Sequence, residues 1–193
     1  NEVVANIALK ILGKKLGQYE YIHPNDHVNM SQSSNDTFPT AMHVAILFAI
    51  RDTLPAIDKL IKSLERKAKQ FSTYKKIGRT HLMDALPVTL GSEFDAYATS
   101  ITKSSHAIIH SKKQLEQVAL GGTAVGTGAN TPKGYRKKAI QELSRISKLK
   151  LIEQKNMQHS LQSKFAIAST SSTIRNLAVE LGKISNDIRL MAS

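Results

Sequence analysis

Hydrophobic residues recur at helical spacing over three long stretches of the chain. The first begins near Pro39, a residue suited to the first turn of a helix, and continues to Leu64. Asp36 and Thr37 stand just before it as candidate N-cap residues. Pro55 lies inside this stretch, and we expect it to kink or break the helix because proline removes a backbone hydrogen bond and clashes with the preceding turn.

The second and third stretches have the spacing of helices that pack nearly parallel in a bundle. The second runs from about Thr89 to Ala119 and the third from about Met157 to Met191. Helices of about 30 residues are roughly 45 Å long, more than a small domain needs, so we expect their apolar faces to pack against one another and against other chains. The repeating positions are Phe94, Ile101, Ile108 and Leu115, and then Ile174, Leu177, Leu181, Ile184, Ile188 and Met191.

The rest of the chain adds little regular structure to this picture. A shorter amphipathic stretch, Tyr135 to Ser147, follows a glycine-rich turn that runs from Gly121 to Pro132. The only modest strand candidate is Lys148 to Ile152. The sequence therefore predicts an all-α fold, a bundle of long helices.

Composition narrows the function classes. The chain has 193 residues, of which 41% are hydrophobic, and a formal charge of +12, but its Lys pairs are scattered and no aromatic-rich binding motif accompanies them. We therefore expect neither a nucleic-acid partner nor, in the absence of a long apolar run, a membrane partner. The lack of cysteine excludes disulfides and thiolate chemistry. Because the chain starts without Met and stops within a periodic segment, we expect it to be an internal piece of a longer polypeptide.

Short polar side chains crowd the segment before the first long helix. Ser33, Ser34 and Asn35 stand where backbone N–H groups at a helix N-terminus favour an anion, and their side chains can donate to a carboxylate. Helix capping is the alternative explanation, but it accounts for one or two of these residues rather than all of them. The segment therefore favours a binding function.

A second polar segment, Gly78 to Gly91, carries a histidine suited to proton transfer. Thr80 and His81 lie between Gly78, which permits a turn, and Pro87, which delays the following helix. An imidazole here can exchange protons near neutral pH, although a single histidine is more often structural or simply exposed. The glycine-rich turn lacks the lysine of a phosphate loop, and His106 and His110 lack the glutamate of a zinc helix. We therefore expect neither a cofactor nor a metal.

Taken in order, three motifs resemble the fumarase/aspartase superfamily, and most strongly its class II fumarate hydratases. They are H-P-N-D-H-V-N…S-Q-S-S-N-D-T-F-P-T-A-M-H (23–43), G-R-T-H-L-M-D-A…P-V-T-L-G (78–91) and G-G-T-A-V-G-T-G-A-N-T (121–131). The resemblance implies a homotetramer with a shared helical bundle and active sites built from three subunits. Residues 1–30 would then end an N-terminal domain, and residues 31–193 would form part of the central helical domain.

The resemblance also implies a reaction, the reversible hydration of fumarate to malate through an aci-carboxylate intermediate, with no metal or cofactor. Carried over to this chain, His81 would serve in proton transfer. Ser33, Ser34, Asn35 and Thr80 would bind the small dicarboxylate substrate. A second dicarboxylate site would involve His23, Asn25 and Asp26.

Two alternatives stay open at this point. Aspartate ammonia-lyase shares the fold and mechanism, but aspartases commonly have Thr where this chain has Ser34. A non-catalytic helical assembly module is the more remote alternative. The family's upstream Ser/Thr motif and its mobile serine loop would lie outside the 193 residues, so we expect the isolated chain to be inactive. The expected compartment is the cytoplasm, with a mitochondrial location as the alternative.

Overall fold

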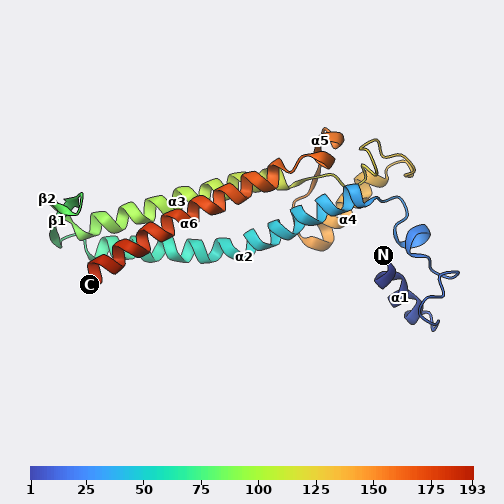
Figure 1. The fold of residues 1–193 in the computed structure, drawn as a ribbon, viewed down its shortest axis with the longest axis horizontal. Coiled ribbons are helices and arrows are strands. Elements are labelled where there is room, and N and C mark those ends of the chain that lie inside the picture. The colour runs from blue at the N-terminus through green and yellow to red at the C-terminus, as the bar shows by residue number, and fades with distance from the viewer. The chain divides into compact units, whose positions relative to one another are not determined.

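The computed structural model describes all 193 residues, and helices dominate it (Figure 1). The all-α prediction is confirmed. In chain order the elements are α1 (Glu2–Ile11), a π-helical turn η1 (Pro24–Val28), α2 (Ser34–Gln70), β1 (Lys75–Thr80), β2 (Met83–Thr89), α3 (Leu90–Leu115), β3 (Gln117–Val118), α4 (Tyr135–Ser147), β4 (Ile152–Glu153), α5 (Met157–Gln162) and α6 (Phe165–Ala192).

The chain divides into two compact units. Unit 1 comprises residues 1–44 and 116–163, and unit 2 comprises residues 45–115 and 164–193. Helix α2 begins in unit 1 and continues in unit 2. The predicted domain boundary near residue 30 stays a prediction. No helix of the chain has the length and apolarity that a membrane span requires.

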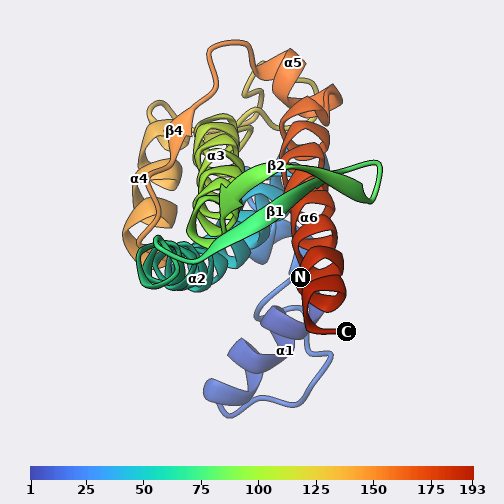
Figure 2. The same ribbon diagram turned by 90° about the vertical axis from the view of Figure 1, so that its left-hand side faces the viewer.

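The core of unit 2 lies between long helices. Helices α3 and α6 pack against each other, and Figures 1 and 2 show them side by side. Ile101 and Ile108 of α3 and Ile184 of α6 are buried, as the repeating apolar positions predict. Ile174 and Ile188 of α6 belong to the same predicted stripe, yet they are 46% and 43% exposed. The chain by itself therefore covers only part of the apolar face of α6.

Helix α2 is longer than the sequence predicts. It begins at Ser34 rather than near Pro39, and it runs unbroken for 37 residues. Of the predicted kink or break at Pro55, the break is wrong, because α-helical structure continues to Gln70. Pro55 is exposed, while Ile57 and Leu64 beyond it are buried, so packing of the later turns compensates for the lost hydrogen bond.

The third predicted helix is in fact two helices, α5 and α6. Ser163 between them adopts an extended conformation, with φ −83° and ψ 137°, and its N–H still donates to the carbonyl of His159 at 2.9 Å. The apolar spacing carries no signal for this two-residue interruption at Ser163 and Lys164. By contrast, the bounds of α4 are those predicted, and its C-cap residue Lys148 takes the left-handed conformation with φ 56°.

The sequence analysis misses the hairpin formed by β1 and β2. The two strands pair antiparallel, with Lys75 opposite Thr89 and Thr80 opposite Met83. Most of their residues are exposed and none is buried, so the alternation of apolar and polar residues that marks a half-buried strand is absent. The predicted strand at Lys148 to Ile152 is displaced, because the short β4 begins only at Ile152 and pairs in parallel with β3.

Candidate active site

The predicted anion-binding residues of unit 1 lie at the N-terminus of α2, where Ser33 caps the helix. The N–H of Asn35 donates to Oγ of Ser33 at 3.2 Å, and the N–H of Ser33 donates to Oδ1 of Asp36 at 3.0 Å. This reciprocal pair is a capping box. The N-cap residue is therefore Ser33 and not Asp36 or Thr37, because the helix begins earlier than predicted, and Asp36 completes the capping box from the third position.

Asp36 also ties the glycine-rich turn to the helix. Its carboxylate is fully buried, and Oδ2 accepts the N–H groups of Gly121 at 3.0 Å and Thr123 at 2.8 Å. The side-chain amide of Asn35 adds a contact by donating to the carbonyl of Ala124 at 3.0 Å. The glycine-rich turn therefore supports a predicted substrate-binding residue.

Gly121 is required where the turn meets α4. Its φ is +84°, and an added Cβ would lie 2.7 Å from Cβ of Arg136. Arg136 in turn donates from Nε to the carbonyl of Gly121 at 3.2 Å and from Nη1 to Glu153 at 2.8 Å. The turn is thus held from both sides by side chains distant in sequence.

Several polar groups at this helix N-terminus remain available to a ligand. Ser34 and Asn35 are exposed, and the hydroxyl of Ser34 has no hydrogen-bond partner within the chain. Oγ of Ser33 is used as an acceptor, which leaves its hydroxyl hydrogen free to donate. This arrangement can supply several donors to a carboxylate or a hydroxyl.

The residues predicted for a second dicarboxylate site lie together in η1. Nδ1 of His23 accepts the N–H groups of Asn25 and Asp26, each at 3.2 Å, and so caps the turn. The N–H of His23 donates to Nδ1 of His27 at 2.8 Å. The side chains of Asn25 and Asp26 are exposed. The hydrogen bonds of His23 therefore fix the backbone of this segment, while its polar side chains face solvent.

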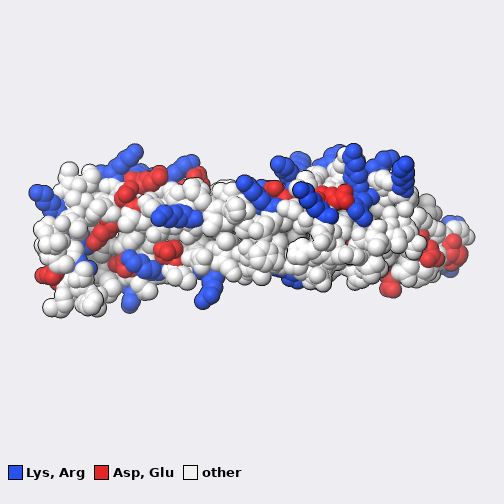
Figure 3. Space-filling model, turned by 90° about the horizontal axis from the view of Figure 1, so that it is seen from above, with Lys and Arg blue, Asp and Glu red and all other residues white.

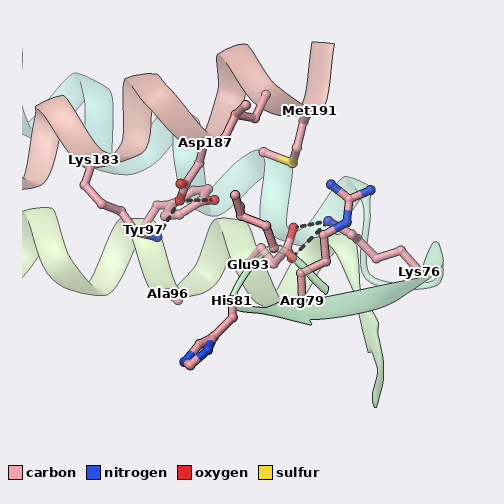
Figure 4. Close-up of a pocket in the computed structure, with 11 residues that line it drawn as sticks. Lys76, Arg79, His81, Glu93, Ala96, Tyr97, Lys183, Asp187 and Met191 are labelled. Atoms are coloured by element: carbon pink, nitrogen blue, oxygen red, sulfur yellow. Dashed lines mark hydrogen bonds and ion pairs between the residues drawn. The ribbon is translucent and has the colours of Figure 1, made fainter. Parts of the chain in front are cut away.

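Thr80 and His81 lie at the tip of the hairpin in unit 2. Because Thr80 pairs with Met83, His81 and Leu82 form a two-residue turn, and both have positive φ, 50° and 60°. Such values suit a hairpin turn but cost a residue with a side chain roughly 1–2 kcal/mol. The His81 imidazole is exposed, makes no hydrogen bond or ion pair within the chain, and points away from Glu93 and Asp187 (Figure 4).

A cavity of about 480 Å³ lies beside the hairpin, between α3 and α6. Two polar clusters line it: Lys76 binds Glu93 at 2.9 Å, and the hydroxyl of Tyr97 donates to Asp187 at 2.9 Å (Figure 4). Lys183 also donates to Asp187. Burial raises the pKa of Asp187, but the hydrogen bonds from Lys183 and Tyr97 outweigh it, so the net shift is downward. The sequence gives little signal for these clusters, since their partners come from different elements.

Replacement of Tyr97 by phenylalanine should change how stability depends on pH. Burial, with a smaller effect of the bond to Asp187, raises the pKa of Tyr97 above its ordinary value of 10.0. An unfolded tyrosine ionises at a lower pH than Tyr97, so stability falls as pH rises above about 10. We expect Tyr97→Phe to cost about 1 kcal/mol at neutral pH and to lose less stability than the parent in alkali. Urea unfolding at neutral pH and at about pH 11 measures both effects.

The matched control for this prediction is Tyr74→Phe, which removes the hydroxyl of a tyrosine that is 58% exposed. It should leave both the neutral stability and the alkaline decline close to those of the parent. Equal alkaline declines for the parent and Tyr97→Phe would contradict the assigned role of the buried phenol.

The eight predicted residues therefore form three local groups. His23, Asn25 and Asp26 share η1, and Ser33, Ser34 and Asn35 share the N-terminus of α2, both in unit 1. Thr80 and His81 share the hairpin of unit 2. Asp36 is the residue that the prediction overlooks as part of this site, although the Ser-x-x-Asp spacing from Ser33 is a signal for it.

The chain combines a bundle of long helices with these three groups of polar residues. Comparison with known proteins identifies the family to which it belongs. The model of the lyase family matches residues 1–193, so the chain belongs to the lyase family. The class II fumarate hydratase of Haemophilus influenzae is 50% identical over 194 residues, which cover 100% of this chain and 42% of that protein. A class II fumarate hydratase of Helicobacter pylori has the same identity and the same coverage.

Solved structures give the same result for the fold. The fumarate lyase:delta crystallin from Brucella melitensis matches with a TM-score of 0.94 and 43% identity, covering 99% of this chain and 42% of that one. The class II fumarase from Schistosoma mansoni matches with a TM-score of 0.91 and 32% identity, covering 99% and 43%. The predicted superfamily is confirmed, and the chain spans about two fifths of the length of the relatives it matches.

Proposed function

We propose that the protein to which this chain belongs is a class II fumarate hydratase, which adds water reversibly to fumarate to give L-malate. The observation that carries the proposal is the 50% identity with proteins of that name over the full chain. The exposed donors at the N-terminus of α2 support it, because a dianionic substrate needs hydrogen-bond donors at its carboxylates.

The local chemistry of the proposed site follows from its residues. Ser33, Ser34 and Asn35 bind a substrate carboxylate or hydroxyl, and Thr80 adds a further hydroxyl. Removal of a proton from the carbon next to a carboxylate leaves an aci-carboxylate, whose negative charge fixed donors stabilise. His81 exchanges the proton through a bound water, because its imidazole is exposed and its ring nitrogens can accept or donate a proton.

In this proposal the whole protein is a homotetramer whose subunits share active sites. The exposed apolar side chains of α6 support this assembly, since Ile174, Val179 and Leu190 are each at least 46% exposed on a bundle helix. Shared sites also fit a chain in which Ser33, Ser34 and Asn35 belong to unit 1, whereas Thr80 and His81 belong to unit 2.

Three further parts of the proposal concern location and other ligands. His23, Asn25 and Asp26 form a second dicarboxylate site, and the enzyme acts in the cytoplasm without a nucleic-acid or membrane partner. Lys and Arg side chains are distributed across the face drawn in Figure 3, with Asp and Glu among them. This mixture supports a solvated surface over a continuous basic track.

The substrate test follows fumarate absorbance with the full-length protein, offered L-malate and then L-aspartate. We expect turnover of malate and none of aspartate. Turnover of aspartate alone would make the protein an aspartate ammonia-lyase, and turnover of neither would point to another lyase of the family or to the non-catalytic module. Ser34 is the residue whose identity favours water over ammonia as the leaving group.

A further inference from the structure

We propose that Asp36 is a positioning residue of the active site: through its buried hydrogen bonds it holds the substrate-binding residues Ser33 and Asn35 in place. The inference rests on the proposed function, because it concerns how that site is kept in its working geometry. Asp36 is fully buried and therefore acts through its neighbours rather than by touching substrate.

Both oxygens of the Asp36 carboxylate are used, and they face different parts of the chain. Oδ1 accepts the N–H of Ser33 at 3.0 Å, which closes the capping box at the start of α2. Oδ2 accepts the N–H groups of Gly121 and Thr123, at 3.0 and 2.8 Å. One side chain thus connects two segments that are more than 80 residues apart in sequence.

A carboxylate fits this position better than an amide does. All three hydrogen bonds to Asp36 come from backbone N–H donors, so each oxygen must act as an acceptor. An asparagine amide offers one accepting atom, and its NH2 group would face at least one N–H that is already a donor. The preference for aspartate is therefore a matter of hydrogen-bond polarity, because the two side chains have nearly the same shape.

Asn35 is the group that this arrangement positions. Its backbone N–H donates to Ser33, and its side-chain Nδ2 donates to the carbonyl of Ala124 in the glycine-rich turn. These contacts leave Oδ1 and the second Nδ2 hydrogen for a ligand. Asp36 holds both of the segments that Asn35 contacts, because it accepts the N–H of Ser33 and the N–H of Thr123, the residue immediately before Ala124. Release of the turn would therefore move the Asn35 amide.

The functional test is a double-mutant cycle on the full-length enzyme, with Asp36→Asn, Asn35→Ala and the double variant. We expect Asp36→Asn to lower kcat/KM for malate about 10- to 30-fold, mainly through KM, because it disturbs groups that bind substrate. In the Asn35→Ala background the same change should cost less than about threefold, because its main target is already absent. Additive effects would overturn the positioning role.

A control separates positioning from general stability. Thr40 is buried one turn further along α2 and donates from Oγ1 to the carbonyl of Asp36 at 2.7 Å, so Thr40→Val alters a buried polar residue without touching Ser33 or Asn35. We expect the loss of this buried hydrogen bond to lower the unfolding midpoint, with KM within about twofold of the parent. A rise in KM as large as that of Asp36→Asn would show that any destabilisation of this region has the same effect.

A second measurement does not depend on the reaction. Hydrogen exchange of at least one of the Ser33, Gly121 and Thr123 amides should be at least tenfold faster in Asp36→Asn than in the parent, because the single amide oxygen of asparagine cannot face all three N–H donors. Unchanged exchange at all three amides would overturn the inference even if malate is the substrate. If malate is not turned over but exchange accelerates, the proposed function fails while the connection through Asp36 stands, and the cycle is repeated on the dicarboxylate that the enzyme does accept.

Discussion

Replacement of His81 by asparagine is expected to lower kcat for malate dehydration by about 10²- to 10⁴-fold, the contribution typical of one acid–base group. The imidazole is exposed at the tip of the hairpin and makes no hydrogen bond or ion pair within the chain that its loss would break. The effect should therefore appear in kcat rather than in stability. Steady-state kinetics of the full-length enzyme, together with its thermal unfolding, measure both.

Asparagine is the informative substitution because of the backbone at this position. His81 has φ 50°, a left-handed conformation that asparagine adopts more readily than most other residues with a side chain. The turn should therefore keep its geometry, and the midpoint of unfolding should not fall. His106→Asn removes another exposed imidazole of unit 2 and serves as the control, with kcat close to the parent value. If His81→Asn kept its activity, His81 would have no role in proton transfer and would only form the turn.

Replacement of Gly91 by alanine should produce the largest loss of stability that the glycines of unit 2 can give. Gly91 lies in the first turn of α3, where an added Cβ would be 2.5 Å from the carbonyl oxygen of Ala68 and 2.7 Å from Cα of Ser72. These are backbone atoms, so relief requires the end of α2 and the start of α3 to move apart. We expect a loss of about 3 kcal/mol.

The control for this prediction is another helical glycine of the same unit. Gly182 lies within α6, and nothing in the chain is within 4 Å of an added Cβ. Alanine is the better helix former, so Gly182→Ala should raise stability by up to about 1 kcal/mol. Chemical unfolding of the two full-length variants at equal protein concentration should move the midpoints in opposite directions. A Gly91→Ala midpoint equal to that of the parent would show that the contact between α2 and α3 yields easily.

Local signals in the sequence predict some elements closely and fail for others. The bounds of α4 are predicted correctly because an amphipathic stretch lies directly after a glycine-rich turn. Helix α2 begins before its predicted start because the capping box of Ser33 and Asp36 lies ahead of the apolar run. The hairpin that carries His81 is missed because its two strands have no buried face, and pairing of exposed strands leaves no apolar alternation.

In the candidate site, too, features that lie within a short run of residues could be predicted from the sequence, whereas contacts between distant segments could not. The residue types at 33–35 and 80–81 indicate donors for an anion and a proton-transfer group, and they are visible in the sequence because each forms a short run. The role of Asp36 is visible only in part. Its spacing from Ser33 suggests a cap, but its bonds to Gly121 and Thr123 depend on segments far along the chain.

The sequence by itself determined the helical class, the lyase superfamily and the polar segments that carry the proposed chemistry, because periodicity and motifs are properties of neighbouring residues. Only the tertiary structure decided which backbone groups the buried Asp36 carboxylate binds and which turn holds His81 with its imidazole exposed. The physical reason is that a buried charge must find its hydrogen-bond donors wherever the folded chain presents them, and a single sequence does not specify which distant N–H groups those will be.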